Sequence, residues 1–288
     1  MARSGFVVAF DFGGSKADVG CASLQGELLE RVRLEIDAPR GAEQAVRRAV
    51  DAAHTLIAGM QPRVGGPCLA AGVVSPGIPG PDHVSLAPNV PGWQNLALGS
   101  LVGEGLGLQT VALGNDAKAA GLAELRWGSL AGADPGLYLS LGTGVSAAVL
   151  VNGRVVNGAH GAAGEIGYAL RGVEDSAAFA DGHAPLEEVA GGRFIGERAS
   201  ALAGRALTAE QAFAADDPGI AAVVDRALDE LAVHVANLAL VLDPQRIAVG
   251  GGLMGSADRV LEALARRLGR ALPFAPEIVA ARFTQDAA

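Results

Sequence analysis

The chain has 288 residues, half of them hydrophobic, and a formal net charge of −9 at pH 7. This length suffices for one large domain or two ordinary ones, and the acidic balance argues against binding to duplex nucleic acid, which needs a basic face. No apolar stretch reaches the length of a membrane span, and the first apolar run, 6–10, is too short for the core of a signal peptide. We therefore expect a cytoplasmic protein with no membrane or nucleic-acid partner.

The first part of the chain consists of short apolar runs punctuated by turns, with one long helical pattern. The residue types predict strands over 6–10, 17–24, 28–36, 69–74 and 110–113. Apolar residues at helical spacing predict a helix over 41–60, and a Pro- and Gly-rich loop is expected over 75–81. A further helix is predicted over 115–126, with Asn115 or Asp116 as its N-cap.

The pattern then restarts with a strand, a Gly-rich turn and two more strands. Strands are predicted over 136–141, 145–151, 154–156, 246–249 and 278–281, and helices over 186–205, 220–242 and 256–272. The two halves form a weak internal repeat at the level of topology. They predict two α/β domains with a ligand cleft between them, a smaller one over 1–114 and a larger one over 115–288.

Three Gly turns each follow an apolar strand and could hold a phosphate through backbone N–H groups. The turn residues are Gly13, Gly14, Ser15, Gly142, Thr143, Gly144, Gly250, Gly251 and Gly252. Lys16, which follows the first turn, is expected to contact the phosphates as well. For any single turn, a tight hairpin with glycine at positive φ explains the residues equally well. The last turn also matches the dinucleotide fingerprint, but the next strand ends in Arg282 and lacks the acidic residue that a nicotinamide cofactor needs.

Carboxylates follow several of these strands. Asp11 sits beside the first turn, where it could hold Mg²⁺ through water or simply cap nearby N–H groups. Asp116 lies at a strand–helix junction, where N-capping alone would explain it. A capping role does not exclude a role in ligand binding. Glu165 is flanked by glycines, whereas Glu187 begins a helix, as the macrodipole favours.

In combination these motifs resemble the ROK family of repressors and sugar kinases, which has the two-domain actin-like (duplicated ribonuclease-H-like) ATPase fold. The resemblance covers nearly the whole chain. It includes the run 11–16, the sugar-side segments 75–77 and 87–93, the catalytic run 115–117, the second phosphate turn 141–144, and the segments 164–167, 186–187 and 243–252.

The resemblance implies a role for each matching position. Asp116 would be the general base, ATP would lie along the three turns, and Mg²⁺ would lie near Asp11. The residues expected on the sugar are Gly77, Asn89, Asn115, Asp116, Glu165, Tyr168 and Glu187. A homodimer is also implied. Together these features predict an ATP-dependent kinase that acts on a hydroxyl of a hexose or hexose derivative. A glucose-like sugar is the first substrate to expect.

The sequence departs from the family pattern in two places. The family's structural zinc uses a His and three Cys, whose positions are occupied here by Tyr168, Ala178, Ala180 and Pro185. The chain's own cysteines, Cys21 and Cys68, lie far away and outside any Cys-x-x-Cys, so we expect no zinc. Tyr168 is then expected to offer its hydroxyl to the sugar. Family members also continue past the position of Ala288 into a further helix.

Two alternatives remain open at this stage, and a third is disfavoured. A weak or inactive sugar-binding sensor of the same family would explain the lost zinc ligands, although Asp11, Asp116 and the Gly turns remain. A repressor is disfavoured, because the first predicted strand begins at Phe6 and leaves no room for a helix-turn-helix. A kinase that uses polyphosphate, or that acts on an amino sugar, would carry the same residues.

Overall fold

The computed structural model describes residues 5–13, 16–36, 41–87, 91–176 and 178–283. The chain divides into two compact units, Met1–Ala119 and Ala120–Ala287, which are described separately below. The break falls inside helix α3 (Asp116–Trp127), whereas the sequence places a boundary between residues 114 and 115. The start of this helix therefore belongs to the first unit and its body to the second.

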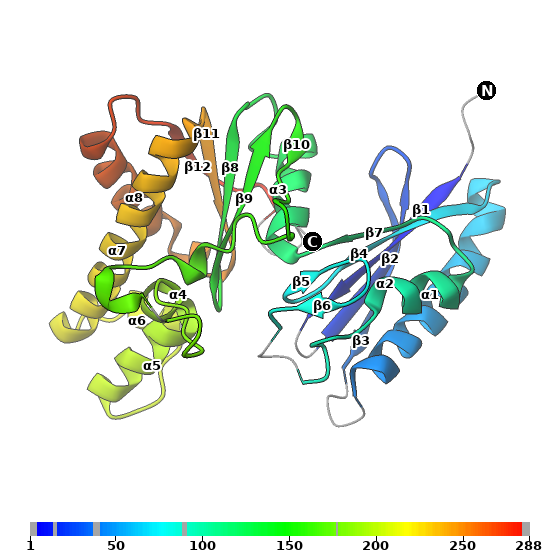
Figure 1. Cartoon of the computed structure of the whole chain (residues 1–288), viewed down its shortest axis with the longest axis horizontal. Coiled ribbons are helices and arrows are strands. Elements are labelled where there is room, and N and C mark those ends of the chain that lie inside the picture. The colour runs from blue at the N-terminus through cyan, green and yellow to red at the C-terminus, as the bar shows by residue number, and fades with distance from the viewer. Residues whose placement is uncertain (1–4, 14–15, 37–40, 88–90, 177, 284–288) are drawn as a thin grey trace. The chain divides into compact units, whose positions relative to one another are not determined.

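The first unit is built on a five-stranded sheet with the order β3-β2-β1-β4-β7 (Figure 1). Its strands are β1 (Phe6–Phe12), β2 (Lys16–Ser23), β3 (Leu28–Glu35), β4 (Cys68–Val74) and β7 (Val111–Gly114). The first three strands are antiparallel neighbours, whereas β4 runs parallel to β1 and β7 parallel to β4. The carboxyl ends of β1, β4 and β7 therefore lie at one edge of the sheet.

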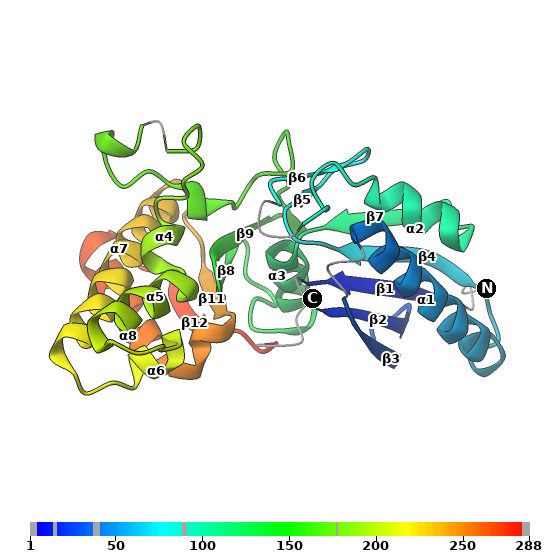
Figure 2. The same ribbon diagram turned by 90° about the horizontal axis from the view of Figure 1, so that it is seen from below.

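Side chains of β1 alternate between the two faces of this sheet. Phe6, Val8, Phe10 and Phe12 are buried on one face, where α1 (Ala42–Val64) and α2 (Leu98–Leu106) lie side by side (Figure 2). The alternation has period two in a strand, so Asp11 faces away from this core. Helix α1 runs past its expected end at residue 60, contains Pro62 near its end, and stops at Val64, where Gly65 takes the left-handed conformation.

The loop after β4 forms a small hairpin of β5 (Ile78–Pro79) and β6 (Val84–Ser85). Trp93, further along this loop, is almost fully buried, and its ring centroid lies 5.2 Å from that of Phe12. Phe12 in turn stacks on Phe10, with their centroids 5.9 Å apart. The aromatic contact therefore ties the loop to the strand that carries Asp11.

The second unit repeats this sheet, with the order β10-β9-β8-β11-β12. The strands are β8 (Gly136–Leu141), β9 (Val145–Val151), β10 (Arg154–Val155), β11 (Arg246–Gly250) and β12 (Glu277–Ala280). Again the first three are antiparallel neighbours and the last two extend the sheet in parallel. The duplicated α/β topology expected from the sequence is confirmed.

Helices cover both faces of the second sheet. The main core lies beneath α4 (Glu187–Ala190), α5 (Gly192–Ala203), α6 (Ala209–Phe213), α7 (Pro218–Leu242) and α8 (Ala257–Ala271). On the other face α3 covers Tyr138, Ala148 and Leu150 (Figure 1). The described residues of this unit also form three short 3-10 turns: η2 (Ile166–Tyr168), η3 (Val173–Asp175) and η4 (Gly252–Ser256).

Three helical features differ from the sequence-based expectation. The single helix expected over 186–205 is two helices, because Gly191 takes an extended conformation between α4 and α5. The expected helix over 256–272 begins instead as η4 and continues as α8. Helices α2 and α6 were not predicted, although α6 begins with a capping box formed by Thr208 and Gln211.

Candidate functional site

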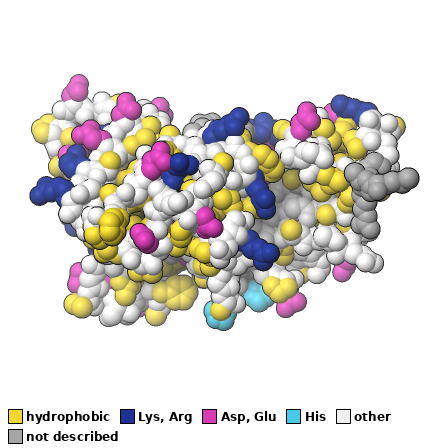
Figure 3. All heavy atoms as spheres, turned by 90° about the horizontal axis from the view of Figure 1, so that it is seen from above, with side chains coloured by type: hydrophobic (Ala, Val, Ile, Leu, Met, Phe, Trp, Pro, Cys, Tyr) yellow, Lys and Arg dark blue, Asp and Glu magenta, His cyan; other side chains and the backbone are white. Residues whose placement is uncertain are grey.

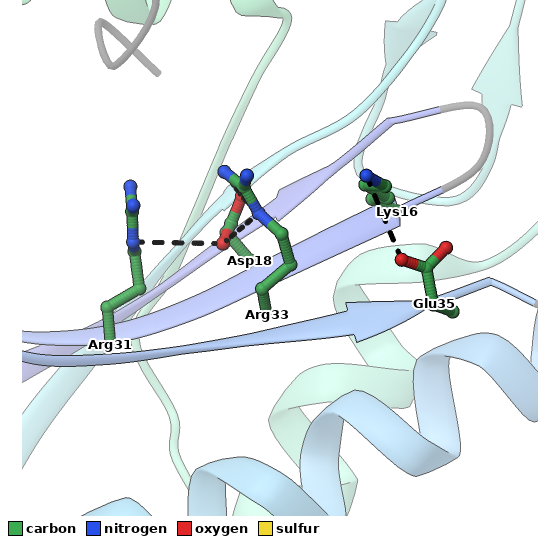
Figure 4. A network of polar contacts seen from close by, with 5 residues as sticks. All are labelled: Lys16, Asp18, Arg31, Arg33 and Glu35. Atoms are coloured by element: carbon green, nitrogen blue, oxygen red, sulfur yellow. Dashed lines mark hydrogen bonds and ion pairs between the residues drawn. The ribbon is translucent and has the colours of Figure 1, made fainter.

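The first Gly turn joins β1 to β2. The Gly13 N–H group donates to the Lys16 carbonyl at 2.8 Å, which closes the hairpin. Gly14 and Ser15, both expected to contact phosphate, lie outside the described residues. The Lys16 ammonium lies 3.8 Å from the Glu35 carboxylate across the sheet, and both side chains are exposed (Figure 4). This pair is open to solvent and contributes little to stability.

A row of charged residues crosses three strands on the face opposite the aromatic core. Asp11 pairs with Asp18, and Asp18 pairs with Arg33, so the three side chains share one face. Arg33 donates to both Asp18 carboxylate oxygens, with distances from 2.7 to 3.0 Å, and the Arg31 Nε lies 3.8 Å from the same carboxylate (Figure 4). The two arginines thus compensate the charge next to Asp11.

Asp11 itself is partly buried among other carboxylates. Burial raises the pKa of its carboxyl group from 3.8 to about 6, with further contributions from Asp116 and Asp18, while Arg33 opposes the shift. Because charges act strongly only at short range in a partly buried site, Asp116 lies within electrostatic reach of Asp11. The first unit therefore brings together the expected metal ligand and the expected base.

The start of α3 positions the catalytic candidates by capping. Asn115 is buried, and its side-chain Oδ1 accepts the Lys118 N–H at 2.9 Å, so it is the N-cap. Asp116 is the first helical residue, and its Oδ1 accepts the Ala117 N–H at 2.8 Å. Although Asp116 keeps an exposed surface, the protein packed around its carboxylate raises its pKa above the usual range, against the effect of this hydrogen bond.

The sugar-side loop is only partly described. Gly77 has φ of +76°, and a Cβ there would lie 2.5 Å from the Ser85 carbonyl oxygen, so only glycine fits this turn. The geometry of this tight hairpin is therefore a sufficient reason for glycine at position 77. Asn89, expected on the sugar, lies outside the described residues.

The second and third Gly turns meet within the second unit. They follow the neighbouring parallel strands β8 and β11, whose register pairs Gly250 with Ser140. A Cβ on Gly251, which has φ of +92°, would lie 2.5 Å from the Leu141 carbonyl oxygen, and one on Gly250 would lie 2.4 Å from the Tyr138 hydroxyl. These two glycines therefore serve close packing between the turns.

A pocket of about 620 Å³ opens beside these turns. From the predicted set it is lined by Gly142, Thr143 and Gly252. Its other walls come from α5, from the start of α6 and the segment before it, and from η4. The sequence reasoning missed these residues: Gly192, Arg193, Gly196, Glu197, Ser200, Ala206, Leu207, Thr208, Ala209, Glu210 and Leu253. In this segment, the capping box formed by Thr208 and Gln211 was the one feature that could have been recognised in the sequence.

The remaining sugar-site candidates gather elsewhere in the second unit. Glu165 precedes η2, Tyr168 ends it, and Glu187 begins α4. Burial raises the pKa of the Tyr168 hydroxyl, and the charges of Glu187 and then Glu165 raise it further, so the three groups lie near one another. Glu187 also accepts the Val145 N–H at 3.1 Å through Oε2.

The segment that carries zinc ligands in the resembled family is held here by other contacts. The Tyr168 and Phe179 rings meet edge to face at 5.5 Å, and the Asp175 carboxylate accepts the Arg171 N–H at 2.9 Å. Further along, Glu188 accepts hydrogen bonds from His183 and the Ala184 N–H. Among the described residues, no group of three or more His, Cys, Asp or Glu could hold a metal ion.

Surface charge and hydropathy add two observations. Acidic, basic and hydrophobic side chains are mixed over the face of the chain that Figure 3 shows. Within the described ranges, no helix is both long and apolar enough to span a membrane.

Known proteins resemble this chain over almost its whole length. The profile of the ROK family matches residues 7–288. A "Bifunctional enzyme NanE/NanK" of Brucella melitensis is 32% identical over 292 residues, covering 98% of this chain but 52% of that protein, so the chain spans about half of its length.

Two solved structures share the fold. A ROK hexokinase from Thermus thermophilus is 30% identical, with a TM-score of 0.82 and coverage of 98% of this chain and 94% of that one. A ROK family glucokinase from Streptomyces griseus, solved with glucose and AMPPNP, is 25% identical, with a TM-score of 0.77 and coverage of 98% and 96%. The fold is thus the duplicated α/β fold of the actin-like ATPases, as expected, and the chain belongs to the ROK family.

Proposed function

We propose that the protein is an ATP-dependent sugar kinase that transfers the γ-phosphate to a hydroxyl of a hexose or hexose derivative. The observation that carries this proposal is the pocket beside the second and third Gly turns, in a chain whose fold matches a glucokinase solved with glucose and AMPPNP. Its volume of about 620 Å³ lies within the range of small-molecule sites.

The nucleotide would lie in this pocket, with its phosphates along the turns. Gly142 and Gly252 present backbone without side chains, and Thr143 adds an exposed hydroxyl. Such backbone N–H groups bind phosphate without requiring positive side chains, which agrees with the acidic composition. The nucleoside would extend along α5 towards Ser200 and Thr208.

Asp116 would take the proton from the attacking hydroxyl. A raised pKa makes its carboxylate a better proton acceptor near neutral pH than an ordinary aspartate. Asn115, fixed as the helix cap, would place this base at the start of α3. In phosphoryl transfer the protein contributes mainly positioning and charge stabilisation, so a fixed base is what the chemistry requires.

The carboxylates of the first unit fit a divalent cation. The charge of Asp116 contributes to the raised pKa of Asp11, and a cation near Asp11 would relieve that repulsion. Asp11 would hold Mg²⁺ through water, since Mg²⁺ keeps several of its waters. When bound, the ion would neutralise charge on the transferred phosphate.

The sugar would be held by polar groups able to satisfy many hydroxyls. Glu165, Tyr168 and Glu187 form one such group in the second unit, and Asn115 and Asp116 are polar candidates in the first. Carboxylates accept hydrogen bonds, and a tyrosine hydroxyl both donates and accepts, so together they can satisfy neighbouring hydroxyls. A site of this kind rejects analogues that lack a hydroxyl.

A coupled ADP-release assay tests the proposal. The purified protein is supplied with ATP, Mg²⁺ and a panel of hexoses, N-acetylhexosamines and amino sugars, and a parallel product assay replaces ATP with polyphosphate. We expect sugar-dependent ADP release with at least one hexose or derivative. No turnover with any sugar would contradict the proposal and favour a sensor, and turnover with polyphosphate alone would overturn the choice of donor.

Family membership also supports a cytoplasmic homodimer as the working form. The chain mass is 28.9 kDa, so light scattering after size exclusion should give about twice this value. A mass equal to that of one chain at micromolar concentration would contradict this part of the proposal.

A further inference from the structure

The junction between α4 and α5 packs directly on the second Gly turn. The Gly192 N–H donates to the Gly142 carbonyl at 2.9 Å, and the Arg193 N–H donates to the Thr143 carbonyl at 3.2 Å. A Cβ on Gly192 would lie 2.6 Å from the Gly142 carbonyl oxygen, and one on Gly191 would lie 2.9 Å from that of Thr143. The turn is therefore held from one side by the backbone of this junction.

The side chain of Glu187 holds the same turn at its other end. Its Oε2 accepts the Val145 N–H at 3.1 Å, where β9 begins. A Cβ on Gly144 would lie 2.2 Å from Oε2, so a side chain at that position would displace the carboxylate. Glu187 is joined to the junction as well, because its carbonyl accepts the Gly191 N–H at 2.7 Å.

Glu187 thus lies next to both the residues proposed for the sugar and the second Gly turn. Its charge contributes to the raised pKa of Tyr168, which places it beside the group of polar residues proposed for the sugar. Its hydrogen bond ends at the strand that follows Gly142 and Thr143, two residues that line the pocket. A residue in this position can contact one substrate while fixing the binding surface of the other.

We propose that Glu187 is a positioning residue for the nucleotide: its carboxylate holds the turn 142–145 in the shape that the pocket requires. This inference rests on the proposed function, because it assumes that the pocket binds a nucleotide. The junction backbone holds the turn at Gly142 and Thr143, whereas the Glu187 side chain holds its other end at Val145. Loss of the bond should therefore loosen the turn and weaken nucleotide binding even when no sugar is present.

The test measures the dissociation constant of Mg²⁺–AMPPNP by calorimetry, without sugar. Glu187→Ala removes the acceptor, and Glu187→Asp keeps the charge but is one methylene too short to reach Val145. Both should weaken binding about tenfold. Glu187→Gln retains an oxygen acceptor of the same reach and should stay within about twofold of the wild type.

Glu188→Ala is the matched control. Glu188 is the adjacent carboxylate on the same short helix, but it accepts hydrogen bonds from His183 and Ala184 rather than from the turn. We expect it to bind AMPPNP as the wild type does. Wild-type affinity in Glu187→Ala and Glu187→Asp, or equal losses in Glu187→Gln and Glu187→Ala, would overturn the inference.

Hydrogen exchange at the Val145 amide gives a readout that needs no nucleotide. Exchange should be about tenfold faster in Glu187→Asp than in the wild type, because the amide loses its acceptor. Unchanged exchange would overturn the inference. If the wild type binds no AMPPNP at all, the proposed function fails, and the exchange experiment still decides whether Glu187 holds the turn.

Discussion

The hairpins β1–β2 and β8–β9 occupy the same place in two sheets of the same strand order, yet they carry different chemistry. In the first hairpin, Asp11 pairs with Asp18 one position before the turn region; in the second, the pair at the same place is Ser140 and Ser146. The charged pair is compensated by Arg33 on β3. The duplicated backbone therefore supports a charged site in one copy and a neutral one in the other.

The surroundings of the two turns explain why this division suits the proposed kinase activity. The first turn lies in a unit where the charge of Asp116 helps to raise the pKa of Asp11, so it suits a cation and a base. The second turn packs against Gly251 and the α4–α5 junction and borders a pocket. Under this account, proton transfer depends on the first unit and nucleotide binding on the second, and each substitution below tests one side of that division.

The largest effect is expected at Asp116. Asp116→Asn keeps the size of the side chain and the start of α3 but removes the proton acceptor, so turnover should fall about 10²- to 10⁴-fold. The dissociation constant of AMPPNP should stay within about threefold, because the pocket lies in the other unit. Sugar-dependent ADP release and calorimetry measure the two quantities. Turnover close to that of the wild type would remove Asp116 from the role of base.

The third turn offers a matched pair of glycines for the second unit. Gly251→Ala forces a side chain into positive φ and to within 2.5 Å of the Leu141 carbonyl, which should lower the free energy of unfolding by about 3 kcal/mol or more. Gly252→Ala meets no described atom within 4 Å and should change it by less than about 0.5 kcal/mol. Urea unfolding compares them, and equal stabilities would show that the turns do not pack as described.

Asp11 should destabilise the first unit at neutral pH. Its folded-state pKa, about 6, lies above the ordinary value of 3.8, so its favourable contribution is complete below pH 3.8 and is lost as the pH rises through 6. Asp11→Asn should therefore raise the free energy of unfolding at pH 7.5 by up to about 3 kcal/mol. The gain should vanish near pH 4. Urea unfolding without Mg²⁺ at both values measures this, and a gain independent of pH would contradict the assignment.

A smaller effect is expected when the charge of the first hairpin is copied into the second. Ser140→Asp places a partly buried carboxylate on β8. In the second sheet, β10 (Arg154–Val155) pairs only with Leu150 and Val151 of β9, so it offers no arginine in the position that Arg33 has in the first sheet. We expect a loss of about 1 to 2 kcal/mol at pH 7. Ser140→Asn is the neutral control of similar size. Thermal unfolding of both variants at pH 7 and pH 4 would decide, since the loss should disappear when the carboxyl group is protonated.

The sequence predicts the repeated scaffold well because its signals are local. Apolar runs ending in glycine marked the strands, and Asn115–Asp116 marked the start of α3. The pocket wall was missed for a physical reason: apolar spacing reports which face of a helix is buried, whereas α5 lines the pocket with residues such as Gly196 and Ser200. The break at Gly191 depends on backbone atoms of a turn almost fifty residues earlier, and no local pattern records that contact.

The most direct test of the central claim is a crystal structure of the protein with a hexose, AMPPNP and Mg²⁺. The account predicts AMPPNP in the pocket lined by Gly142, Thr143 and Gly252, and a sugar hydroxyl within hydrogen-bonding distance of the Asp116 carboxylate. Nucleotide bound outside that pocket, or a sugar whose hydroxyls all lie beyond reach of Asp116, would contradict it.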